Sequence, residues 1–554
     1  MQIMEPNRPR WTWINSFAIV FSLLTILLIF GCQSAMTTTT TMADTTGLTT
    51  TTTNTINTTN SGKIDVLTYH YDNLRDGVDS DETTLTPQNV NSASFGKLFS
   101  VSVDGDVYAQ PLYKSNLLMP DGTVHDVMFV VTENDSLYAI DANNGAILWQ
   151  DSFIDPNNGI IPVPSADTLT DDITPEVGIT GTPVIDATTS TIYFVSNVKN
   201  TNNNTYAQYL HAIDLVTGKE KFNGPELISA SVKNAAGTTI SFDPLLGNQR
   251  SALLLLNGTV YIAWASHGDN GDYHGWIMSY SAQDVSRQLG VLITTLNGSE
   301  GGVWMAGGGL SSDGSYIFAG VANGTCDPST QDYGDSMLKL SPSTLKIIDS
   351  FSAFNYDELN NNDDDFASAE PLLIQSASTP LVITADKLGV IYVLNQNNLG
   401  GYGKSRNNDI QEISVGNTPI MNNMAYFNGQ LYVGANNMPL ESFNLSNGDF
   451  NPSPASATQN EFGNGGEDGQ GANPVISSDG SSDGIVWALD NTNLWNGPTV
   501  LHAYDGANLS VELYNSAQVP GDAAGNAEVF TSPLVVNGKV IVTGVNTVTV
   551  YGLK

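Results

Sequence analysis

The chain has 554 residues, of which 56 are acidic and 19 are basic, so its formal net charge at pH 7 is −37. This charge argues against nucleic acids and anionic membrane surfaces as partners, because both would repel the protein. The two cysteines, Cys32 and Cys326, are too few for a disulfide framework, and the sequence contains no CxxCH motif for covalent haem attachment.

The N-terminus has the pattern of an export signal. Arg8 and Arg10 form a basic segment before the apolar stretch 17–30, which is short for a membrane span. The end of this stretch, Ile-Phe-Gly-Cys, resembles a bacterial lipobox, which implies that Cys32 is the lipidated first residue of the mature protein. We therefore predict a signal peptide over residues 1–32, with an ordinary cleaved signal as the alternative to lipidation. The expected location is the bacterial cell envelope, periplasmic or surface-facing, with membrane contact only through the lipid anchor.

Two further segments precede the main body of the chain. Residues 33–62 are rich in Thr and Asn and show no apolar periodicity, which predicts a disordered tether. Residues 63–94 are rich in Asp and carry Asn73 and Arg75. We expect them to form an N-terminal extension that packs on the main domain and is not a separate domain.

A repeated pattern organises the rest of the chain. Residues 127–150, VMFVVTENDSLYAIDANNGAILWQ, predict three short strands separated by two polar turns. The pattern returns at 211–222, HAIDLVTGKEKF, and more loosely at 502–514, HAYDGANLSVELY. Repeats of this kind are typical of propellers and solenoids.

Residues 95–554 contain eight such units, and Asn-Gly or Asp-Gly pairs between apolar runs predict their hairpins. In unit four, residues 304–310 are the predicted inner strand. Six of the units begin with a proline at the start of the inner strand: Gln110-Pro111, Thr182-Pro183, Glu370-Pro371, Thr418-Pro419, Asn473-Pro474 and Ser532-Pro533.

The last unit runs out of chain after three strands, whereas a lone strand at 95–103 precedes the first unit. If this strand completes the last blade, the ring closes and no open edge remains. We therefore predict an all-β, eight-bladed propeller with four-stranded blades over residues 95–554. Seven blades is the alternative, because unit three is the least regular.

The segment 139–149, AIDANNGAILW, resembles the tryptophan-docking motif of the pyrroloquinoline quinone (PQQ) dehydrogenases and their relatives. In that family the tryptophan, here Trp149, packs between neighbouring blades. The resemblance covers nearly all of residues 95–554, but cofactor-free propeller lipoproteins of outer-membrane assembly share the same repeats. It is strongest to bacterial PQQ-repeat proteins of undefined activity, which share stretches such as GITGTPVI at 178–185 and ASHGDNGDYHGW at 265–276.

This resemblance implies a cofactor site on the propeller axis. Trp304, in GGVWMAGGGL, resembles the floor beneath the quinone, where an electron-rich ring stacks on an electron-poor one. Lys387, in ADKLGVIYVLNQ, resembles the basic residue that points at the quinone oxygens and stabilises the negative charge of the reduced form. The structural alternatives are a core tryptophan between blades and a lysine in a turn.

The resemblance also implies a metal site. Asn323, in GVANGT, resembles the family's amide ligand to calcium. One of Asp363 and Asp365 resembles the catalytic aspartate that removes the substrate's hydroxyl proton. The pair resembles the two carboxylates of the lanthanide-dependent methanol dehydrogenases. The family's glutamate ligand is missing, and Asp269 and Asn270 stand in its place as potential calcium ligands. The structural alternatives are an Asn-Gly turn and a solvated acidic loop.

Two functions follow from these features. In the first, the protein is a dehydrogenase of an alcohol or sugar hydroxyl that uses PQQ with calcium or a lanthanide and passes electrons to an external acceptor. In the second, it is a non-catalytic scaffold that binds a protein or glycan partner in the envelope. A calcium-stabilised propeller without redox chemistry is a third possibility. The axial residues favour the first function. The missing glutamate and the lack of an adjacent cysteine pair favour the second, so the sequence leaves open whether the protein is an enzyme. Cys326 and His267 lack a spaced partner motif, and we expect both to be structural.

Overall fold

The computed structural model describes residues 36–43, 49–56, 62–375, 378–463 and 469–554. The chain divides into two compact units, Met1–Gly62 and Lys63–Lys554. In the first unit, strands β1 (Met36–Ala43) and β2 (Thr49–Ile56) pair antiparallel. The sequence predicts a tether without regular structure here, and the strand propensity of β-branched threonine accounts for the difference. The signal peptide and the lipidation of Cys32 lie outside the described residues and stay predictions.

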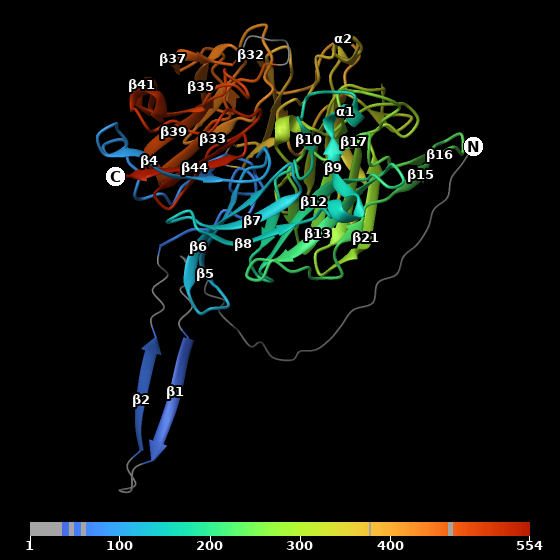
Figure 1. Cartoon of the computed structure of the whole chain (residues 1–554). Helices are drawn as coiled ribbons and strands as arrows, with labels where there is room; N and C mark the ends of the chain where they lie inside the picture. The colour runs from blue at the N-terminus through green and yellow to red at the C-terminus, as the bar shows by residue number, and fades with distance from the viewer. Residues whose placement is uncertain (1–35, 44–48, 57–61, 376–377, 464–468) are drawn as a thin grey trace, which may run out of the picture. The chain divides into compact units, whose positions relative to one another are not determined.

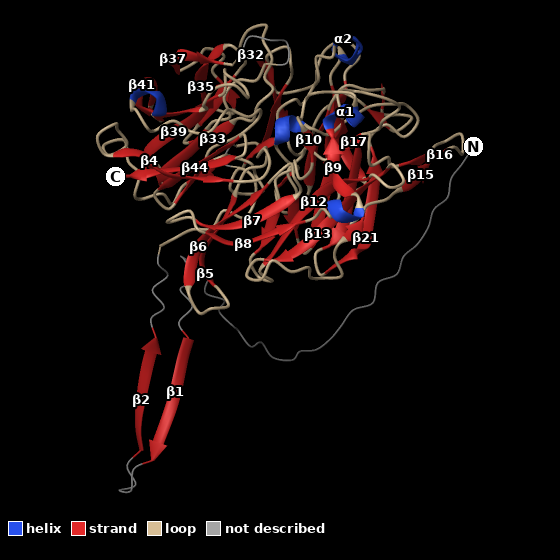
Figure 2. Cartoon of the chain, viewed as in Figure 1, coloured by secondary structure: helices blue, strands red, loops and turns tan. Residues whose placement is uncertain are grey.

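In the second unit, the described strands form eight antiparallel blades arranged in a ring (Figure 1). Strands and loops make up nearly all of it, and the helices are short (Figure 2). Within the described residues, no helix is both long and apolar enough to cross a bilayer. Blades one to four consist of β5 (Leu112–Leu118), β6 (Val124–Val131), β7 (Ser136–Asp141) and β8 (Ile147–Ser152); β11 (Val184–Asp186), β12 (Thr191–Asn200), β13 (Thr205–Asp214) and β14 (Glu226–Leu227); β18 (Leu254–Leu256), β19 (Thr259–Ser266), β20 (Trp276–Ser281) and β21 (Asp284–Ile293); and β22 (Ser311–Ser312), β23 (Ile317–Val321), β26 (Ser336–Leu340) and β27 (Ile347–Ser352).

Blades five to eight follow the same plan, in which successive strands of the chain pair from the inside of the ring outward. They consist of β28 (Leu372–Ile374), β29 (Leu381–Ala385), β30 (Val390–Asn395) and β32 (Gln411–Ser414); β33 (Ala425–Phe427), β34 (Gln430–Gly434), β35 (Met438–Ser446) and β37 (Ser456–Phe462); β38 (Val475–Asp479), β39 (Ser482–Asp490), β40 (Val500–Asp505) and β41 (Asn508–Asn515); and β42 (Leu534–Val536), β43 (Lys539–Gly544), β44 (Thr547–Leu553) and β4 (Phe95–Ser102).

The ring is closed by a strand from its own beginning. Strand β4 pairs antiparallel with β44, the last strand of the chain, and the register runs from Phe95 opposite Leu553 to Ser102 opposite Thr547. In Figure 1 the blue β4 lies beside the red β44. The predicted eight-bladed propeller with an N-terminal closing strand is therefore confirmed, and the seven-bladed alternative is wrong. Because β4 covers the outer edge of β44, the last blade is complete and its third strand is not left with an unpaired edge.

Apolar clusters hold neighbouring blades together. In the described part of the chain, eight clusters of buried side chains each span one pair of adjacent blades. Trp149 on β8 shows what the repeated motif contributes. Its indole Nε1 donates to the carbonyl oxygen of Leu215 in blade two at 3.1 Å. A Cβ on Gly218 would lie 3.1 Å from the indole, so the ring packs against the glycine of the next copy. Trp149 thus docks between two blades, as the resemblance implies.

Residues 63–82 form a segment that we call the axial plug. Between Val66 and Gly77 this segment hydrogen-bonds to the first strand of every blade. The partners in blades one to eight are Tyr113, Ile185, Leu255, Ser312, Leu373, Tyr426, Ile476 and Val535. A short segment can reach all eight first strands only if it lies on the axis and these strands are the innermost ones. The predicted packed extension therefore fills part of the channel.

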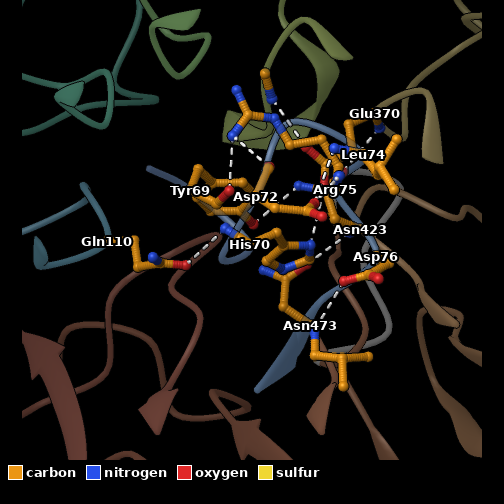
Figure 3. Close-up of polar contacts among 12 residues, drawn as sticks. Tyr69, His70, Asp72, Leu74, Arg75, Asp76, Gln110, Glu370, Asn423 and Asn473 are labelled. Atoms are coloured by element: carbon orange, nitrogen blue, oxygen red, sulfur yellow. Dashed lines mark hydrogen bonds and ion pairs between the residues drawn. The ribbon is translucent and has the colours of Figure 1, made fainter. Parts of the chain in front are cut away.

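Buried polar contacts fix the plug (Figure 3). The guanidinium of Arg75 is fully buried and donates to the carbonyl oxygens of Tyr69 at 2.6 Å and Leu310 at 3.1 Å. Nδ1 of His70 lies 2.8 Å from Oε1 of Glu370, in a contact whose angles do not make it a hydrogen bond. Both side chains are fully buried. Because a buried polar group without a partner is costly, these contacts hold the plug in one position.

Side chains at the start of the inner strands also link neighbouring blades. The hydroxyl oxygen of Thr182 accepts a hydrogen bond from the backbone N–H of Gln110 at 2.9 Å. In the same way, the side-chain oxygen of Asn423 accepts from the N–H of Glu370 at 2.8 Å, and that of Asn473 accepts from the N–H of Asn423 at 2.6 Å. Four residues that precede predicted prolines, Gln110, Thr182, Glu370 and Asn473, therefore take part in these links between blades.

Two predicted strand starts are wrong. In blade six, β33 begins at Ala425, after the linking residue Asn423, and not next to the predicted Thr418-Pro419 pair. In blade four, residues 304–310 do not form the inner strand, because Met305–Gly307 is a 3₁₀ turn, η2. Its three residues all have positive φ, between 49° and 79°. Successive left-handed residues cannot adopt the pleated backbone of a strand.

We predict that Phe95→Ala lowers the free energy of unfolding by about 3–5 kcal/mol. Phe95 is fully buried on β4 and contacts the rings of Trp487, Tyr514 and Tyr551, so truncation leaves a cavity between blades seven and eight. Urea unfolding followed by tryptophan fluorescence measures the loss. Leu98→Ala on the same strand is the control, because Leu98 is 42% exposed. Equal losses for the two variants would contradict the role of the buried face of β4.

Candidate functional site

A cavity of about 660 Å³ lies where loops of several blades converge. Most of its lining residues either precede a first strand, as Trp304 and Phe530 do, or follow a second strand, as Asn323 and Lys387 do. Because the first and second strands of a blade are antiparallel, both positions lie at the same end of the ring. The lining includes six of the predicted site residues: Asp269, Trp304, Asn323, Asp363, Asp365 and Lys387.

Asn270 is the predicted site residue that the structure places outside this lining. Its Nδ2 donates to the backbone carbonyl oxygens of Thr168, Leu169 and His267. The bonds to Thr168 and Leu169 tie the loop after β19 to the C-terminal end of the short helix α1 (Ser165–Thr168). Asn270 therefore stabilises the loop that carries Asp269, while the neighbouring Asp269 faces the cavity.

Backbone strain is concentrated around the cavity. Four lining residues other than glycine have φ between 53° and 59°: Asp269, Asp363, Trp495 and Phe530. The turn 305–307 adds three consecutive left-handed residues beside Trp304. Each such residue other than glycine costs on the order of 1 kcal/mol or more, and it persists only where its surroundings impose it. Strain gathered in this way is typical of sites at which side-chain direction matters more than stability.

Asp365 connects the predicted residues to one another. Its Oδ2 accepts a hydrogen bond from Nε1 of Trp304 at 3.2 Å and lies 2.8 Å from Nζ of Lys387. Its Oδ1 accepts from the backbone N–H of Asn323 at 2.9 Å. Three donors from blades four and five thus converge on one buried carboxylate. With its oxygens already engaged, Asp365 is better placed to position its neighbours than to take a proton from a ligand.

Asp363 has a free side toward the cavity. Its side chain is 55% exposed, lies 3.1 Å from Nζ of Lys387 and accepts a hydrogen bond from Nδ2 of Asn323 at 3.1 Å. Even so, partial desolvation raises the pKa of Asp363 to about 6, and repulsion from Asp365 adds to this. Burial lowers the pKa of Lys387, but the two carboxylates outweigh burial and raise it above its ordinary value. A carboxyl with this pKa on a cavity wall is suited to general-base chemistry near neutral pH.

The donors around Asn323 have the chemistry of a site for a hard cation. The Nδ2 of Asn323 donates to Oδ2 of Asp269 at 3.2 Å and to Oδ1 of Asp363 at 3.1 Å. As the described side chains stand, no three His, Cys, Asp or Glu residues converge closely enough to hold an ion. If the amide of Asn323 turned, its oxygen would face the two carboxylates, and carboxylate and amide oxygens are the ligands that calcium prefers. The residue types therefore fit a metal, although its binding would require the side chains to move closer together.

Several cavity residues were not predicted from the sequence: Tyr108, Arg250, Trp495 and Phe530. Trp495 is 41% exposed, and its Nε1 donates to Oε1 of Glu528 at 2.9 Å. The rings of Trp304 and Phe530 meet edge-on, with their centroids 5.9 Å apart. No local motif marks these residues, since they come from loops of different blades that meet only when the ring closes.

Cys326 and His267 have the properties of structural residues. Both are buried, and Cys326 is a free thiol. Burial raises the pKa of the Cys326 thiol to about 11, which keeps it protonated and poorly nucleophilic at neutral pH. Burial also lowers the pKa of His267 to about 4.

The fold matches those of known dehydrogenases. The quinohemoprotein alcohol dehydrogenase from Comamonas testosteroni is 15% identical, with a TM-score of 0.55 over 88% of this chain and 80% of the other. The quinohemoprotein alcohol dehydrogenase ADHIIG from Pseudomonas putida HK5 is 14% identical, with a TM-score of 0.54 over the same shares. A europium-containing methanol dehydrogenase is 13% identical, with a TM-score of 0.58 over 89% of this chain and 99% of the other. The chain shares the eight-bladed propeller fold of these dehydrogenases. It matches no protein-family model and no curated protein.

At such identities the likeness establishes the fold alone, because one fold can carry many activities. The dehydrogenase-like fold and the cavity agree in one respect. The residues that the sequence resemblance singles out, Trp304, Asp365 and Lys387, are in direct contact with one another or with a shared partner.

Glu133 is a fully buried carboxyl within electrostatic range of Arg250. Its Oε2 accepts hydrogen bonds from the N–H of Gly178 at 2.7 Å and the hydroxyl of Thr180 at 2.9 Å, whereas its Oε1 has no hydrogen-bond partner among the described residues. Burial raises the pKa of Glu133 from 4.5 to about 8. The protonated carboxyl therefore contributes stability that is complete below pH 4.5 and is lost as the pH rises through about 8.

We predict that Glu133→Gln flattens the pH dependence of stability. Glutamine is neutral at every pH and retains an acceptor for Gly178 and Thr180. The drop in the free energy of unfolding between about pH 6 and pH 9 should therefore shrink by roughly 1–3 kcal/mol. Urea titrations at several pH values measure the slope. Glu358→Gln, at an exposed position of α2 (Tyr356–Asn362), is the control. The same slope in wild type and Glu133→Gln would show that Glu133 is already ionised in the folded protein.

Proposed function

We propose that the protein is an envelope-anchored dehydrogenase of an alcohol or sugar hydroxyl that uses PQQ together with calcium or a lanthanide. The observation that carries the proposal is the convergence of Trp304, Asn323, Asp363, Asp365 and Lys387 on one axial cavity. The fold shared with alcohol and methanol dehydrogenases supports it. A bound quinone would supply the acceptor for the two electrons and the hydrogen that leave an oxidised alcohol.

Each residue has a distinct role in this proposal. Trp304 provides a flat wall for a planar ligand, and Lys387, whose Nζ lies 5.7 Å from the Trp304 ring centroid, places positive charge beside that wall. Asp363 accepts the proton of the substrate hydroxyl, since its carboxyl faces the cavity and its pKa is raised to about 6. Asp365 orients Trp304 and Lys387, and it would hold a metal together with Asn323.

The surroundings of the site and the sequence suggest what else the reaction needs. Asp171 and Asp172 also line the cavity, so the substrate proposed here is a neutral alcohol or sugar. The sequence contains no CxxCH motif, and the electrons are therefore proposed to pass to an external acceptor. Export through the N-terminal signal and anchoring at Cys32 remain part of the proposal, because an oxidoreductase of this class would work in the envelope.

We predict that the protein binds PQQ in the presence of calcium or a lanthanide, as measured by calorimetry and cofactor absorbance. Trp304→Ala and Lys387→Ala should each weaken binding by about 10-fold or more, because each removes a group that contacts the ligand directly. Asp363→Asn should retain binding but lose oxidation of alcohols with an artificial electron acceptor. Asp364→Asn is the matched control, since Asp364 is the neighbouring acid and does not line the cavity. Absence of PQQ binding with any of these metals would contradict the proposal and favour a non-catalytic scaffold with an envelope protein or glycan partner.

We also predict a terbium signal from the metal site. Nε1 of Trp304 lies 3.2 Å from the Asp365 carboxylate, so a Tb³⁺ ion held there should emit when tryptophan is excited. Trp304→Phe should reduce this emission while binding measured by calorimetry persists. Asp365→Asn should weaken the binding itself, whereas Asp364→Asn should change neither signal. If the Asp363→Asn/Asp365→Asn double variant retained wild-type emission, the ion would lie elsewhere.

A further inference from the structure

Arg250 is a buried cation in the cavity wall. The residue is 5% exposed and belongs to the lining of the cavity. Its Nη2 is buried without a hydrogen-bond partner, and no residue of the described chain forms an ion pair with its guanidinium. Removing a guanidinium from water without giving it a partner is unfavourable, so buried arginines are normally paired. The cavity is therefore incomplete on this side.

Two aromatic rings flank the guanidinium. Its Cζ lies 5.6 Å from the ring centroid of Tyr108 and 5.2 Å from that of Phe530. Ring faces attract the charge but accept no ordinary hydrogen bond from it, so the N–H groups stay available. Phe530 also contacts Trp304, with 5.9 Å between the centroids. The cation is thus held close to the tryptophan wall of the proposed site.

Two acids lie within electrostatic range of Arg250, but neither pairs with its guanidinium among the described residues. Glu133 and Glu528 are both fully buried, and neither forms an ion pair with the guanidinium within the described chain. The Oε1 of Glu528 accepts hydrogen bonds from Nε1 of Trp495 at 2.9 Å and from the N–H of Val529 at 2.8 Å. Burial raises the pKa of Glu528 to about 7, as it raises that of Glu133, so neither acid carries a full negative charge at neutral pH. The positive charge of Arg250 therefore remains available to an anionic ligand.

We propose that Arg250 is the anion anchor of this cavity and binds a carboxylate of a flat ligand whose ring lies along Trp304. A planar carboxylate matches the fork of N–H donors on a guanidinium, and the pairing is strong when water is excluded. The acidic residues Asp269, Asp363 and Asp365 provide the opposite chemistry and suit a cation or hydroxyl group. The cavity therefore selects a ligand with an anionic group on one side. This inference rests on the proposed function only for the placement of the ligand's ring along Trp304. The lack of an ion pair at Arg250 among the described residues is independent of the proposed function.

The test uses benzene-1,3,5-tricarboxylate, its trimethyl ester and PQQ as probes, with binding measured by calorimetry at constant ionic strength. The wild-type protein should bind the tricarboxylate and should not bind the ester. Arg250→Gln should weaken binding of the tricarboxylate and of PQQ by about 10- to 100-fold, the range expected for a charged hydrogen-bond pair. The affinity of Arg250→Lys should lie between those of the wild type and Arg250→Gln, because lysine retains the positive charge but lacks the forked N–H donors of a guanidinium. Arg287→Gln is the control, because Arg287 is an exposed arginine on β21.

The outcomes separate this inference from the proposed function. Binding of the tricarboxylate without binding of PQQ would support the anchor and contradict the quinoprotein proposal. Equal binding of PQQ by wild type and Arg250→Gln would support the quinoprotein proposal and contradict the role of Arg250 as an anchor. The anchor is also overturned if the wild type binds no tricarboxylate, or if it binds the acid and the ester equally. Circular dichroism checks the fold of each variant. If Arg250→Gln does not fold, Arg250→Lys and the comparison of acid with ester decide the question.

Discussion

The structure depends on the pairing of polar groups along the propeller axis, where little water is available to replace them. The first strands of eight blades meet there, and each presents backbone groups that need partners. The axial plug supplies them to every blade between Val66 and Gly77. Arg75 and the His70–Glu370 pair anchor the plug by contacts that are wholly buried. The ring and the plug therefore require each other.

The same constraint acts differently in the cavity at the loop end. Here polar groups pair across blades, but some of their donors and acceptors remain free to bind a ligand. Lys387 is shared by two carboxylates, the amide of Asn323 bridges Asp269 and Asp363, and Arg250 is left with aromatic neighbours. Left-handed residues in the surrounding loops show that side-chain direction is maintained at a cost in backbone strain. A region that tolerates both unmatched charge and strain has the character of a binding site.

Fold and function have separate support in this protein. The propeller is shared with alcohol and methanol dehydrogenases at 13–15% identity, which is enough to recognise the architecture. Propellers serve many functions, so the proposed redox chemistry would depend on the cavity residues and not on the blades. The hydrogen bonds of Asp365 to Trp304 and Asn323, together with its ion pair to Lys387, make that cavity one connected unit.

The blades and the strand that closes the ring can be predicted from the sequence. Alternating apolar residues, Asn-Gly and Asp-Gly turns and the lone strand at 95–103 are local signals, and strand pairing between neighbours in the chain follows from them. The resemblance to the PQQ dehydrogenases identified the candidate site residues, because each lies in a short motif that can be recognised in the sequence. These residues are Trp304, Asn323, Asp363, Asp365 and Lys387.

The other residues of the cavity become apparent only in the folded ring. Arg250 and Phe530 come from blades three and eight, and Asn270 turns away although its neighbour Asp269 faces inward. The left-handed turn at 305–307, read from the sequence as part of a strand, is likewise imposed by its surroundings. These positions depend on contacts between loops distant in sequence, and such contacts exist only once the ring has closed.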